Sequence, residues 1–478
     1  MNYIANSYSM RTTKVLLFFI IAFVFTACSK KDETPENIQV QNFVWKGLNA
    51  YYLWQGNISD LSDRRFSSEQ QLYNYLNGYS DPKNLFESLL YQRGTVDKWS
   101  WIVDDYIALE QALQGTSQTT GMEFGIAPYR SQPNNVYGYV RYVVPGTDAA
   151  TKGVTRGMLF TEVNGTQLTR QNYRNLLFSD ATSYTIGLAD YNTGNPVRNA
   201  NSLSLNKGNT TENPVHVAKT LDVSGRKIGY LMYNGFTSNF DAQLNTAFGQ
   251  FKADNVTDLI VDLRYNGGGA VSTATRLGSM ITGQFNGEIF AQQMWNSKIM
   301  SATTTESLVN RFVNTLSNGT AINSLNLTRV YFITTGDSAS ASELVMNSLA
   351  PYITVRSVGN RTHGKYAGSI TMYDSPTFTS KSGINPNHNW AMQPIVLEIV
   401  NKEGKNDKDG IDPTVDLDED FGNLGVLGDP NEPLLKRTIE LITTGRKSNR
   451  PRSAFSVHPI SNSKANSPTF NNMYVDTE

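Results

Sequence analysis

A serine-rich segment followed by a single lysine is the feature of this chain best suited to chemistry. Ser340 is the middle serine of Gly-Asp-Ser-Ala-Ser-Ala-Ser-Glu at residues 336–343, and Lys365 stands 25 positions after it. A serine hydroxyl is a poor nucleophile until a base takes its proton, and a desolvated lysine amine can be that base in place of histidine. The pair therefore predicts a serine hydrolase with a Ser–Lys dyad.

The same segment allows other interpretations. Ser340 and Glu343 have the spacing of a capping box, in which the serine only begins a helix. His363, just before the lysine, could instead form a Ser–His–Asp set with Ser340. Asp262 and Arg264, which end an apolar run, are expected to form an internal ion pair or to support a turn rather than to act in catalysis.

Alternating strands and helices after residue 221 predict the layers that position this pair. Apolar strands are expected at residues 227–233, 259–264 and 329–335, and the serine segment opens the helix after the last of them. Such alternation is typical of an α/β architecture with functional groups at the strand ends. The strand at 259–264 runs into Tyr-Asn-Gly-Gly-Gly, where glycines let bare backbone approach a ligand.

Two other kinds of pattern precede and follow this region. Residues 37–113 carry apolar side chains at helical spacing, and residues 114–120 have the composition of a linker. Short strands with glycine turns are expected from Gly121 onward, with a polar excursion at residues 192–213. The Arg-, Ser-, Asn- and Pro-rich sequence of residues 446–478 predicts a disordered tail.

The first residues have the pattern of a signal peptide that starts at Met10. A basic stretch precedes an apolar run at residues 15–25, which is too short to span a bilayer and ends close to Cys28. This ending resembles a bacterial lipoprotein signal, and the charged residues 29–33 resemble the surface-export tags of some Bacteroidetes lipoproteins. The expected location is therefore the cell envelope, with a lipid anchor on Cys28 in the outer membrane facing the periplasm or the surface; an ordinary secretory signal is the alternative.

Composition excludes several classes of protein. The chain has 41 basic and 42 acidic residues, so no net field favours a nucleic-acid partner. Its 24 tyrosines and 22 phenylalanines are incompatible with a wholly disordered chain. The acidic loop at residues 407–416 departs from a calcium-binding loop, with Lys405 at the first ligand position and Asp416 at the last. No metal and no cofactor are expected, and the histidines at 216, 388 and 458 are expected to be structural or exposed.

Three motifs in order resemble the C-terminal processing, or tail-specific, serine peptidases. They are Asp-Leu-Arg-x-Asn-Gly-Gly-Gly at residues 262–269, Ser-Ala-Ser-Ala-Ser-Glu at 338–343 and Thr-His-Gly-Lys at 362–365. The resemblance implies that Ser340 is the nucleophile and Lys365 the base. It also implies an oxyanion hole formed by the N–H of Ala341 and that of Gly267 or Gly268. Many relatives carry a glutamine four residues after the lysine, where this chain has Ser369 as the candidate orienting residue.

The strands between residues 118 and 217 resemble a PDZ domain, with the shared hairpin turn at Val163-Asn164-Gly165. In that family an apolar–Gly–apolar loop binds a peptide's C-terminal carboxylate, which places this role on Phe124, Gly125 and Ile126. The implied function is a serine endopeptidase that cleaves polypeptides near their C-terminus, with a PDZ domain that recruits the tail or gates access. A non-catalytic, PDZ-bearing binding lipoprotein is the alternative.

The expected fold is α+β and multidomain, with an N-terminal helical region, a PDZ-like β-rich domain and an α/β catalytic domain of ClpP/crotonase-like layers. The expected partners are protein or peptide substrates and a membrane. The expected boundaries are a signal peptide at 1–28, a tether at 29–36, a helical domain at 37–113, a PDZ-like domain at 118–217, a Ser–Lys peptidase domain at 218–445 and a disordered tail at 446–478.

Overall fold

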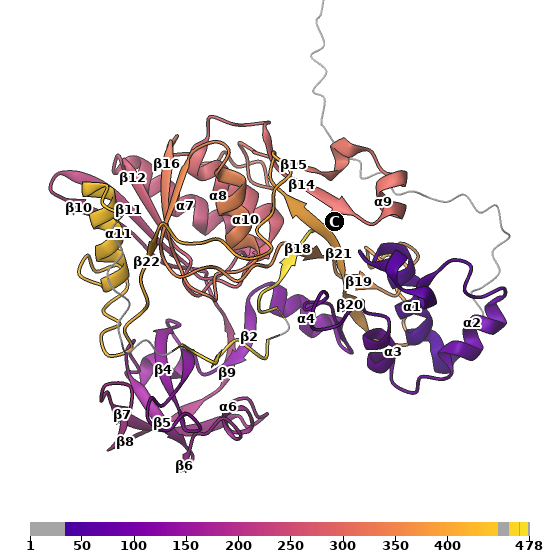
Figure 1. Cartoon of the computed structure of the whole chain (residues 1–478), viewed down its shortest axis with the longest axis horizontal. Coiled ribbons are helices and arrows are strands. Elements are labelled where there is room, and N and C mark those ends of the chain that lie inside the picture. Colours follow the sequence, from indigo (N-terminus) through magenta and orange to yellow (C-terminus); the bar gives the residue numbers. More distant parts are fainter. Residues whose placement is uncertain (1–33, 448–457, 468, 477–478) are drawn as a thin grey trace, which may run out of the picture.

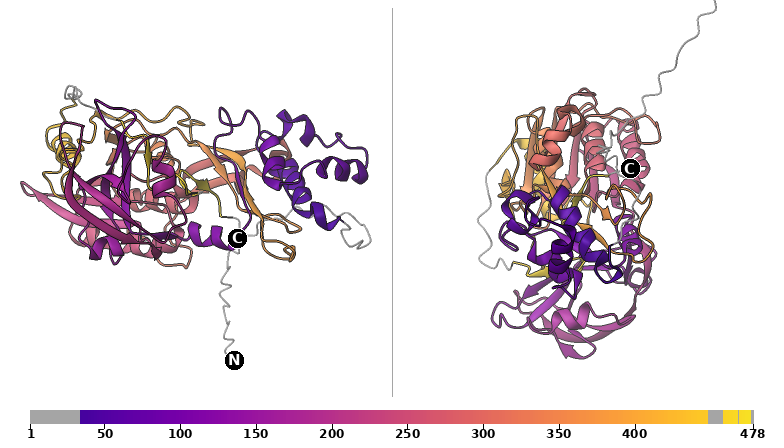
Figure 2. Two further views of the ribbon diagram at one scale, coloured as in Figure 1. Left: turned by 90° about the horizontal axis from the view of Figure 1, so that it is seen from below. Right: turned by 90° about the vertical axis from the view of Figure 1, so that its right-hand side faces the viewer.

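The computed structural model describes residues 34–447, 458–467 and 469–476. The predicted signal peptide and Cys28 lie outside these residues. Within them, no helix is both long and apolar enough to cross a bilayer. Helices gather at one end of the molecule, a β-rich domain lies below the other end, and an α/β region lies above that domain (Figures 1 and 2). The predicted α+β class is confirmed.

The N-terminal region is helical, as predicted. It consists of α1 (Gln39–Tyr51), α2 (Glu69–Leu76), α3 (Pro82–Ser88) and α4 (Tyr106–Leu113), with one-turn 3-10 helices at Glu36–Ile38, Gln55–Asn57 and Ser59–Leu61. Asp81 and Asp105 begin α3 and α4 by accepting backbone N–H bonds, which satisfies donors that have no partner inside the helix. A sheet of β1 (Trp101–Val103), β20 (Ala391–Gln393) and β19 (Met372–Tyr373) joins this region to the α/β part.

The β-rich domain is an antiparallel sheet in the order β23-β3-β4-β5-β7-β8, with β6 paired to β5. Its strands are β3 (Met122–Pro128), β4 (Val136–Val143), β5 (Leu159–Val163), β6 (Thr166–Gln167), β7 (Ser183–Asp190), β8 (Val197–Asn206) and β23 (Ser461–Asn462), with short helices α5 (Asp148–Thr151) and α6 (Tyr173–Leu177). Asn164 and Gly165 both have positive φ, 51° and 74°, as a two-residue hairpin turn requires.

Two polar stretches beside this domain form strands, so the linker prediction for residues 114–120 is wrong. Thr116–Thr119 (β2) pairs antiparallel with Gly208–Thr211 (β9), which belongs to the predicted excursion. The hydroxyls of Thr116 and Thr211 lie 2.8 Å apart across the pair. This ribbon is held by pairing between distant residues, and its polar sequence has no apolar alternation that could have revealed it.

The α/β part is built on a six-stranded main sheet in the order β10-β11-β12-β16-β17-β22. The strands are β10 (Val215–Val223), β11 (Arg226–Tyr233), β12 (Asp258–Asp262), β16 (Arg329–Thr334), β17 (Thr354–Gly359) and β22 (Val415–Asp416), and all except β10 run parallel. Side chains of β12 alternate between two cores. Leu259 and Val261 lie in the same core as residues of α7 (Asp241–Ala253), α8 (Val271–Thr282) and α10 (Ala341–Leu349), whereas Ile260 shares a core with α11 (Pro433–Thr444). Cover on both faces explains the continuous apolar runs of these strands.

A second six-stranded sheet has the order β13-β24-β18-β21-β14-β15. Its strands are β13 (Gly269–Ala270), β24 (Met473–Tyr474), β18 (Ala367–Ser369), β21 (Ile395–Val400), β14 (Ile289–Trp295) and β15 (Val309–Arg311), flanked by α9 (Ser297–Ala302) and 3-10 turns at Ser238–Phe240 and Thr305–Leu308. The predicted disorder of the tail is therefore wrong for residues 458–467 and 469–476, which supply β23 and β24. Strand edges far away in the sequence fix this segment, so its own low hydrophobicity gave no signal.

The predicted ion pair between Asp262 and Arg264 is confirmed, at 2.7 Å. Arg264 is fully buried and also binds Glu419 and Glu432, the residue that caps α11. Arg156 of the β-rich domain donates to Glu419 at 2.9 Å, so the same network fixes that domain against the end of β12. These charges are structural.

Candidate active site

Ser340 lies between β16 and α10, in a strained backbone conformation. Its φ of 65° and ψ of −115° are rare for a residue with a side chain, and such strain persists only where the surroundings enforce it. Ser340 is fully buried. Its Oγ has no hydrogen-bond partner within the part of the chain that the structure describes. The hydroxyl is therefore held in place at the start of α10, and it donates its proton to no described group.

The two flanking serines are occupied, unlike the middle one. Ser338 Oγ donates to the carbonyl of Leu263 at 2.8 Å, and Ser342 Oγ donates to the carbonyl of Asn266 at 3.0 Å. Both bonds tie the start of α10 to the turn after β12. Of the three serines, Ser340 alone has a hydroxyl without a described partner, which separates a candidate nucleophile from two structural residues.

Lys365 lies on the connection from β17 to β18, and only 2% of the residue is exposed. Burial lowers the pKa of Lys365 to about 7, against the opposing effect of the Asp97 and Glu343 carboxylates. Its Nζ donates to the carbonyl of Asn471 in the tail and lies 5.6 Å from the centre of the Trp99 ring. A lysine with this pKa carries a substantial neutral fraction at neutral pH and can accept a proton.

Glu343 joins the serine and lysine segments. One of its oxygens accepts the N–H groups of Ser340 at 2.7 Å and Lys365 at 2.9 Å. The other accepts the N–H of Gly364 at 2.5 Å and the hydroxyl of Thr362 at 2.6 Å. The capping-box spacing seen in the sequence thus has a tertiary use, because the same carboxylate that caps α10 also fixes the backbone of Lys365.

The glycine turn after β12 passes directly over Ser340. Gly268 has a φ of 112°, and a Cβ placed on it would lie 2.6 Å from Ser340 Oγ, so a side chain is excluded there. The N–H of Gly268 is already bonded to Asn266 Oδ1 at 2.9 Å. Ala341 begins α10, where N–H groups have no acceptor inside the helix. Ala341 and Gly267 are therefore the remaining candidates for the oxyanion hole. The N–H of Gly268 stabilises the turn through its bond to Asn266.

The three segments meet because they follow neighbouring parallel strands. The glycine turn follows β12, the serine segment follows β16 and the lysine segment follows β17. Carboxyl ends of parallel strands lie at one edge of a sheet, where such folds place their ligand sites. Sequence reasoning found all three, but missed Trp99 and Asp97, which approach from the N-terminal region with no motif to mark them.

Two predicted roles near Lys365 have no supporting contact. The Ser369 hydroxyl lies 2.6 Å from Gln393 Oε1 and forms no described hydrogen bond with Lys365. The N–H of His363 donates to the carbonyl of Ser338 at 3.0 Å, and burial lowers the pKa of its imidazole. Because Ser340 Oγ has no described partner, neither His363 nor Lys365 is hydrogen-bonded to it, and Lys365 Nζ donates to the carbonyl of Asn471 instead. No described contact supports Ser369 as the residue that orients Lys365 or His363 as the base.

Phe124, Gly125 and Ile126 lie inside strand β3 and do not form the predicted loop, so that conformation was wrong. Their edge is paired with β23 of the tail, in the register Ser461↔Ile126 and Asn462↔Gly125. Binding of a peptide carboxylate by these residues stays a prediction.

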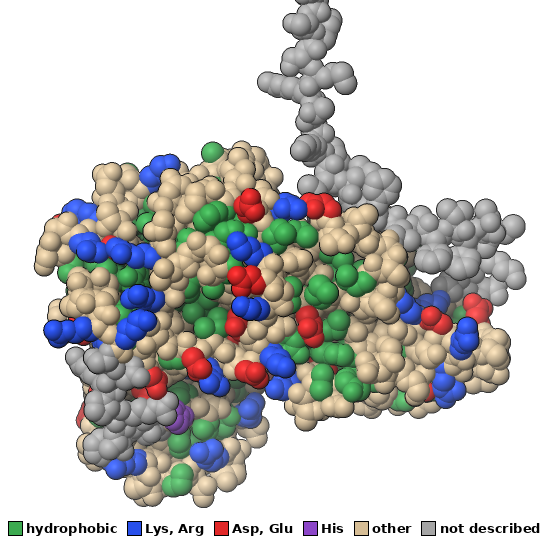
Figure 3. All heavy atoms as spheres, turned by 45° about the horizontal axis from the view of Figure 1, so that its top comes forward, with side chains coloured by type: hydrophobic (Ala, Val, Ile, Leu, Met, Phe, Trp, Pro, Cys, Tyr) green, Lys and Arg blue, Asp and Glu red, His purple; other side chains and the backbone are tan. Residues whose placement is uncertain are grey.

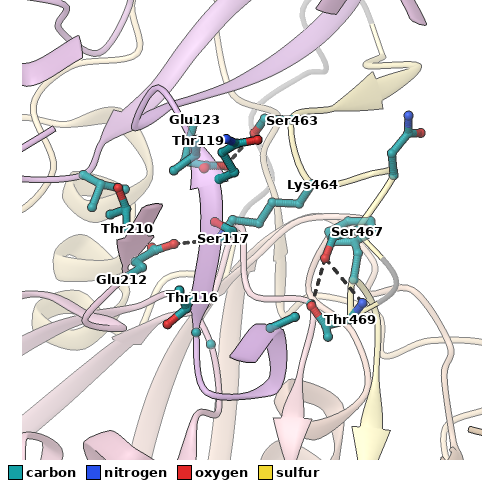
Figure 4. Close-up of a pocket in the computed structure, with 18 of the residues that line it drawn as sticks. Thr116, Ser117, Thr119, Glu123, Thr210, Glu212, Ser463, Lys464, Ser467 and Thr469 are labelled. Carbon is teal, nitrogen blue, oxygen red and sulfur yellow. Dashed lines mark hydrogen bonds and ion pairs between the residues drawn. The ribbon is translucent and has the colours of Figure 1, made fainter. Parts of the chain in front are cut away.

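A pocket of about 440 Å³ runs from this edge to the glycine turn (Figure 4). It is bordered by the β2–β9 ribbon, β3, residues 267–269 and the tail. Glu123 and Glu212 give it an acidic wall, and Lys464 reaches into it from the tail (Figure 4). The pocket thus extends from the candidate recognition edge to the glycine turn beside Ser340, although neither Ser340 nor Lys365 lines it. Among the described residues, no group of three or more His, Cys, Asp or Glu side chains could hold a metal ion, including the 407–416 loop.

Comparisons with known proteins agree with this geometry. A model of Peptidase family S41 matches residues 227–417, and a model of the Peptidase S41 N-terminal domain matches residues 39–101. Together they take in more than half of the chain. A C-terminal processing peptidase from the chloroplast of Tetradesmus obliquus is 26% identical over 233 residues. That match covers 46% of this chain and 46% of the relative, so it spans about half of the relative's length.

Two solved structures are similar to this chain. A Bacteroides fragilis NCTC 9343 protein, named as an S41 protease, has a TM-score of 0.66 at 22% identity over 84% of this chain and 97% of its own. The photosystem II D1 C-terminal processing protease has a TM-score of 0.48 at 18% identity over 84% of this chain and 100% of its own. At these identities the first likeness shows a common fold. With two models of this family matched in chain order over more than half of the sequence, the chain belongs to peptidase family S41.

Proposed function

We propose that this protein is an endopeptidase in which Ser340 is the nucleophile and Lys365 is the general base. The observation that carries the proposal is the buried Oγ of Ser340, which donates to no group among the described residues and lies on a strained backbone. Glu343 supports it, because one carboxylate fixes the backbone of both residues.

In this proposal, burial of Lys365 supplies a neutral amine for the reaction. Neutral Lys365 takes the proton of Ser340 Oγ as the oxygen attacks the carbonyl carbon of a peptide bond. We expect the N–H groups of Ala341 and Gly267 to stabilise the negative charge that develops on the carbonyl oxygen. The ammonium of Lys365 then protonates the leaving amine, and the acyl group stays on Ser340. Water, deprotonated by the lysine in turn, releases the acyl group and restores the enzyme.

Cleavage near a substrate's C-terminus, with the β-rich domain acting as a PDZ-like recruiter, is the finer part of the proposal. The matched relative is named as a C-terminal processing peptidase. The unbroken path from the edge of β3 to the glycine turn offers a route by which a tail held at one end reaches the reaction centre at the other. A peptide that adds a strand to a sheet edge is the mode of binding that PDZ domains use.

Incubation with an unfolded protein, followed by mass spectrometry of the products, tests the proposal. Ser340→Ala and Lys365→Ala should each abolish cleavage, and the double variant should be no worse than either, because nucleophile and base act as one unit. Ser301→Ala and Lys252→Met change exposed residues of α9 and α7 and should keep full activity. Activity that survives Lys365→Ala but not His363→Ala would reassign the base. Absence of cleavage by every form, including forms with a displaced tail, would favour a binding protein on this fold.

A further inference from the structure

The last described segment of the chain lies along the whole of the proposed substrate path. Ser461 and Asn462 extend the sheet at β3 as strand β23. The next residue continues the pairing, because the N–H of Ser463 donates to the carbonyl of Phe124 at 2.8 Å and Ser463 Oγ accepts the N–H of Phe124 at 3.1 Å. The tail therefore occupies the edge to which a peptide substrate would add.

Beyond this strand, Lys464 enters an acidic pocket. Its Nζ lies 3.0 Å from Glu212 and 2.9 Å from the hydroxyl of Tyr142, while Ser463 Oγ donates to Glu123 at 2.5 Å (Figure 4). Although burial alone would lower the pKa of Lys464, Glu212, Tyr142 and Glu123 raise it well above its ordinary value. Two carboxylates that share one partly buried pocket repel each other unless a cation accompanies them. The pocket is thus built for a basic side chain.

Further along, the tail fills the reaction centre. Lys365 Nζ donates to the carbonyl of Asn471. A Cβ added to Gly268 would lie 2.6 Å from Ser340 Oγ and also 2.6 Å from the carbonyl oxygen of Asn472. The backbone of the tail therefore lies close to the candidate nucleophile. Met473 and Tyr474 then pair with Gly269 and Ala270. A scissile peptide needs the space beside Ser340 that these tail residues take.

The direction of the tail separates it from a substrate. In a substrate recruited by its C-terminus, the recruited residues follow the bond to be cut. In this tail, residues 461–464 at the recruitment edge precede residues 471–474 at the reaction centre. The Asn471 carbonyl also faces the base. The tail therefore crosses the site in the direction opposite to that of a substrate recruited by its C-terminus.

We propose that residues 461–474 are a built-in competitor of substrate, and that Glu123 and Glu212 form a subsite for a basic side chain. Substrates that displace the tail are then extended polypeptide segments that place a lysine or arginine between these carboxylates. This inference rests on the proposed peptidase function, because only a peptidase would bind a substrate along this pocket. The predicted binding of a basic peptide does not itself require catalysis.

A binding experiment on inactive full-length chains tests the inference. The probe is a fluorescent synthetic peptide with the sequence of residues 458–476, added to Ser340→Ala and to Ser340→Ala with Lys464→Glu. The second substitution should loosen the chain's own tail, so the peptide should bind the double variant at least about tenfold more tightly than the single one. A peptide carrying alanine in place of Lys464 should bind the double variant about tenfold more weakly. Lys447→Glu, the same charge change at an exposed residue, is the matched control and should leave peptide binding as in the single variant.

Equal binding by the single and double variants, no binding by either, or equal binding of the two peptides would each overturn the inference. Hydrogen exchange on the unmodified chain adds a test without a variant. The N–H groups of Ser463 and Val475, bonded to Phe124 and Ser369, should exchange slowly, and exchange at the rate of an unfolded chain would refute the docked tail. Cleavage of the unmodified chain between residues 470 and 473 would make the tail a substrate and not a competitor. If the peptide binds as expected but no form cleaves protein, the proposed function fails while the ligand site stands.

Discussion

At the scale of single residues, the site depends on one amine that burial keeps partly neutral and one hydroxyl that nothing else uses. Burial lowers the pKa of Lys365 to about 7, and Asp97 and Glu343 keep it from falling further. The hydroxyls of Ser338 and Ser342 serve the fold and leave Ser340 free. The chemistry therefore depends on which groups are desolvated and on which hydrogen bonds are left unmade.

The pH dependence of activity follows from this lysine. A base must be deprotonated, so kcat/KM for a short peptide should rise with pH, with a midpoint near 7. Asp97→Asn removes a carboxylate that raises the lysine's pKa, so the midpoint should move to lower pH. A pH titration of initial rates for both forms provides the measurement. If the midpoint stays in place in Asp97→Asn, Lys365 is not the titrating base.

Glu343 should act as a positioning residue. Glu343→Gln replaces one carboxylate oxygen by an amide group that cannot accept, so two buried donors lose their partner at a cost of about 1–3 kcal/mol each. The expected result is a lower Tm and a kcat reduced by at least about tenfold with KM little changed, because substrate contacts are untouched. Steady-state kinetics and thermal unfolding measure this, with the exposed Glu403→Gln as control. A rise in KM at constant kcat would assign Glu343 to substrate binding instead.

At the scale of elements, the sequence predicts the helices and strands that have a local periodic pattern of apolar residues. The helices of the N-terminal region repeat at 3.6 residues, and β11, β12 and β16 of the main sheet are apolar runs buried on both faces; these elements were predicted, whereas β10 and β22 were not. The β2–β9 ribbon and the strands of the tail were not, because distant partners hold them. The same limit applies within the site. The spacing of Ser340 and Glu343 was visible, but the bonds from Glu343 to residues 362–365 come from tertiary structure.

Substitution of Gly268 tests whether the glycine turn must lie close to Ser340, and a second glycine with positive φ controls for backbone strain. Gly268→Ala should abolish activity, because its Cβ would stand 2.6 Å from Ser340 Oγ. Gly287→Ala is a matched control, since Gly287 also has positive φ, at 86°, but nothing lies within 4 Å of its added Cβ. Gly287→Ala should lose about 1–2 kcal/mol of stability from its positive φ, and Gly268→Ala should lose more because its Cβ also meets the carbonyl oxygen of Asn472 at 2.6 Å; only Gly268→Ala should lose cleavage. Equal activity of the two variants would contradict a role for this turn beside the nucleophile.

At the scale of the whole molecule, three regions contribute to one site. The N-terminal region supplies Trp99 and Asp97, the α/β part supplies Ser340 and Lys365, and the β-rich domain supplies Glu123. Acidic and basic side chains are mixed across the middle of the face in Figure 3. With 41 basic and 42 acidic residues in all, long-range attraction contributes little to substrate capture. Selectivity must then come from local groups such as the acidic pocket.

The cellular location remains a prediction from residues outside the described structure. If Cys28 carries a lipid, Cys28→Ala should move the protein from the membrane fraction to the soluble fraction, because this cysteine would be its anchor. Immunoblots of fractionated cells make the measurement, with Ser29→Ala as the neighbouring control. An unchanged distribution would contradict the lipoprotein interpretation.

The covalent attachment of the tail has a kinetic consequence. A strand tethered to the domain it binds is present at an effective concentration on the order of millimolar, whatever the concentration of the protein. Dilution would therefore release a separate inhibitor but leave this segment in place across β3 and β13. A free polypeptide at micromolar concentration must bind about a thousandfold more tightly than the tail to replace it in half of the molecules. Substrates that are themselves held close, such as chains crowded at the same surface, gain the most from this arrangement.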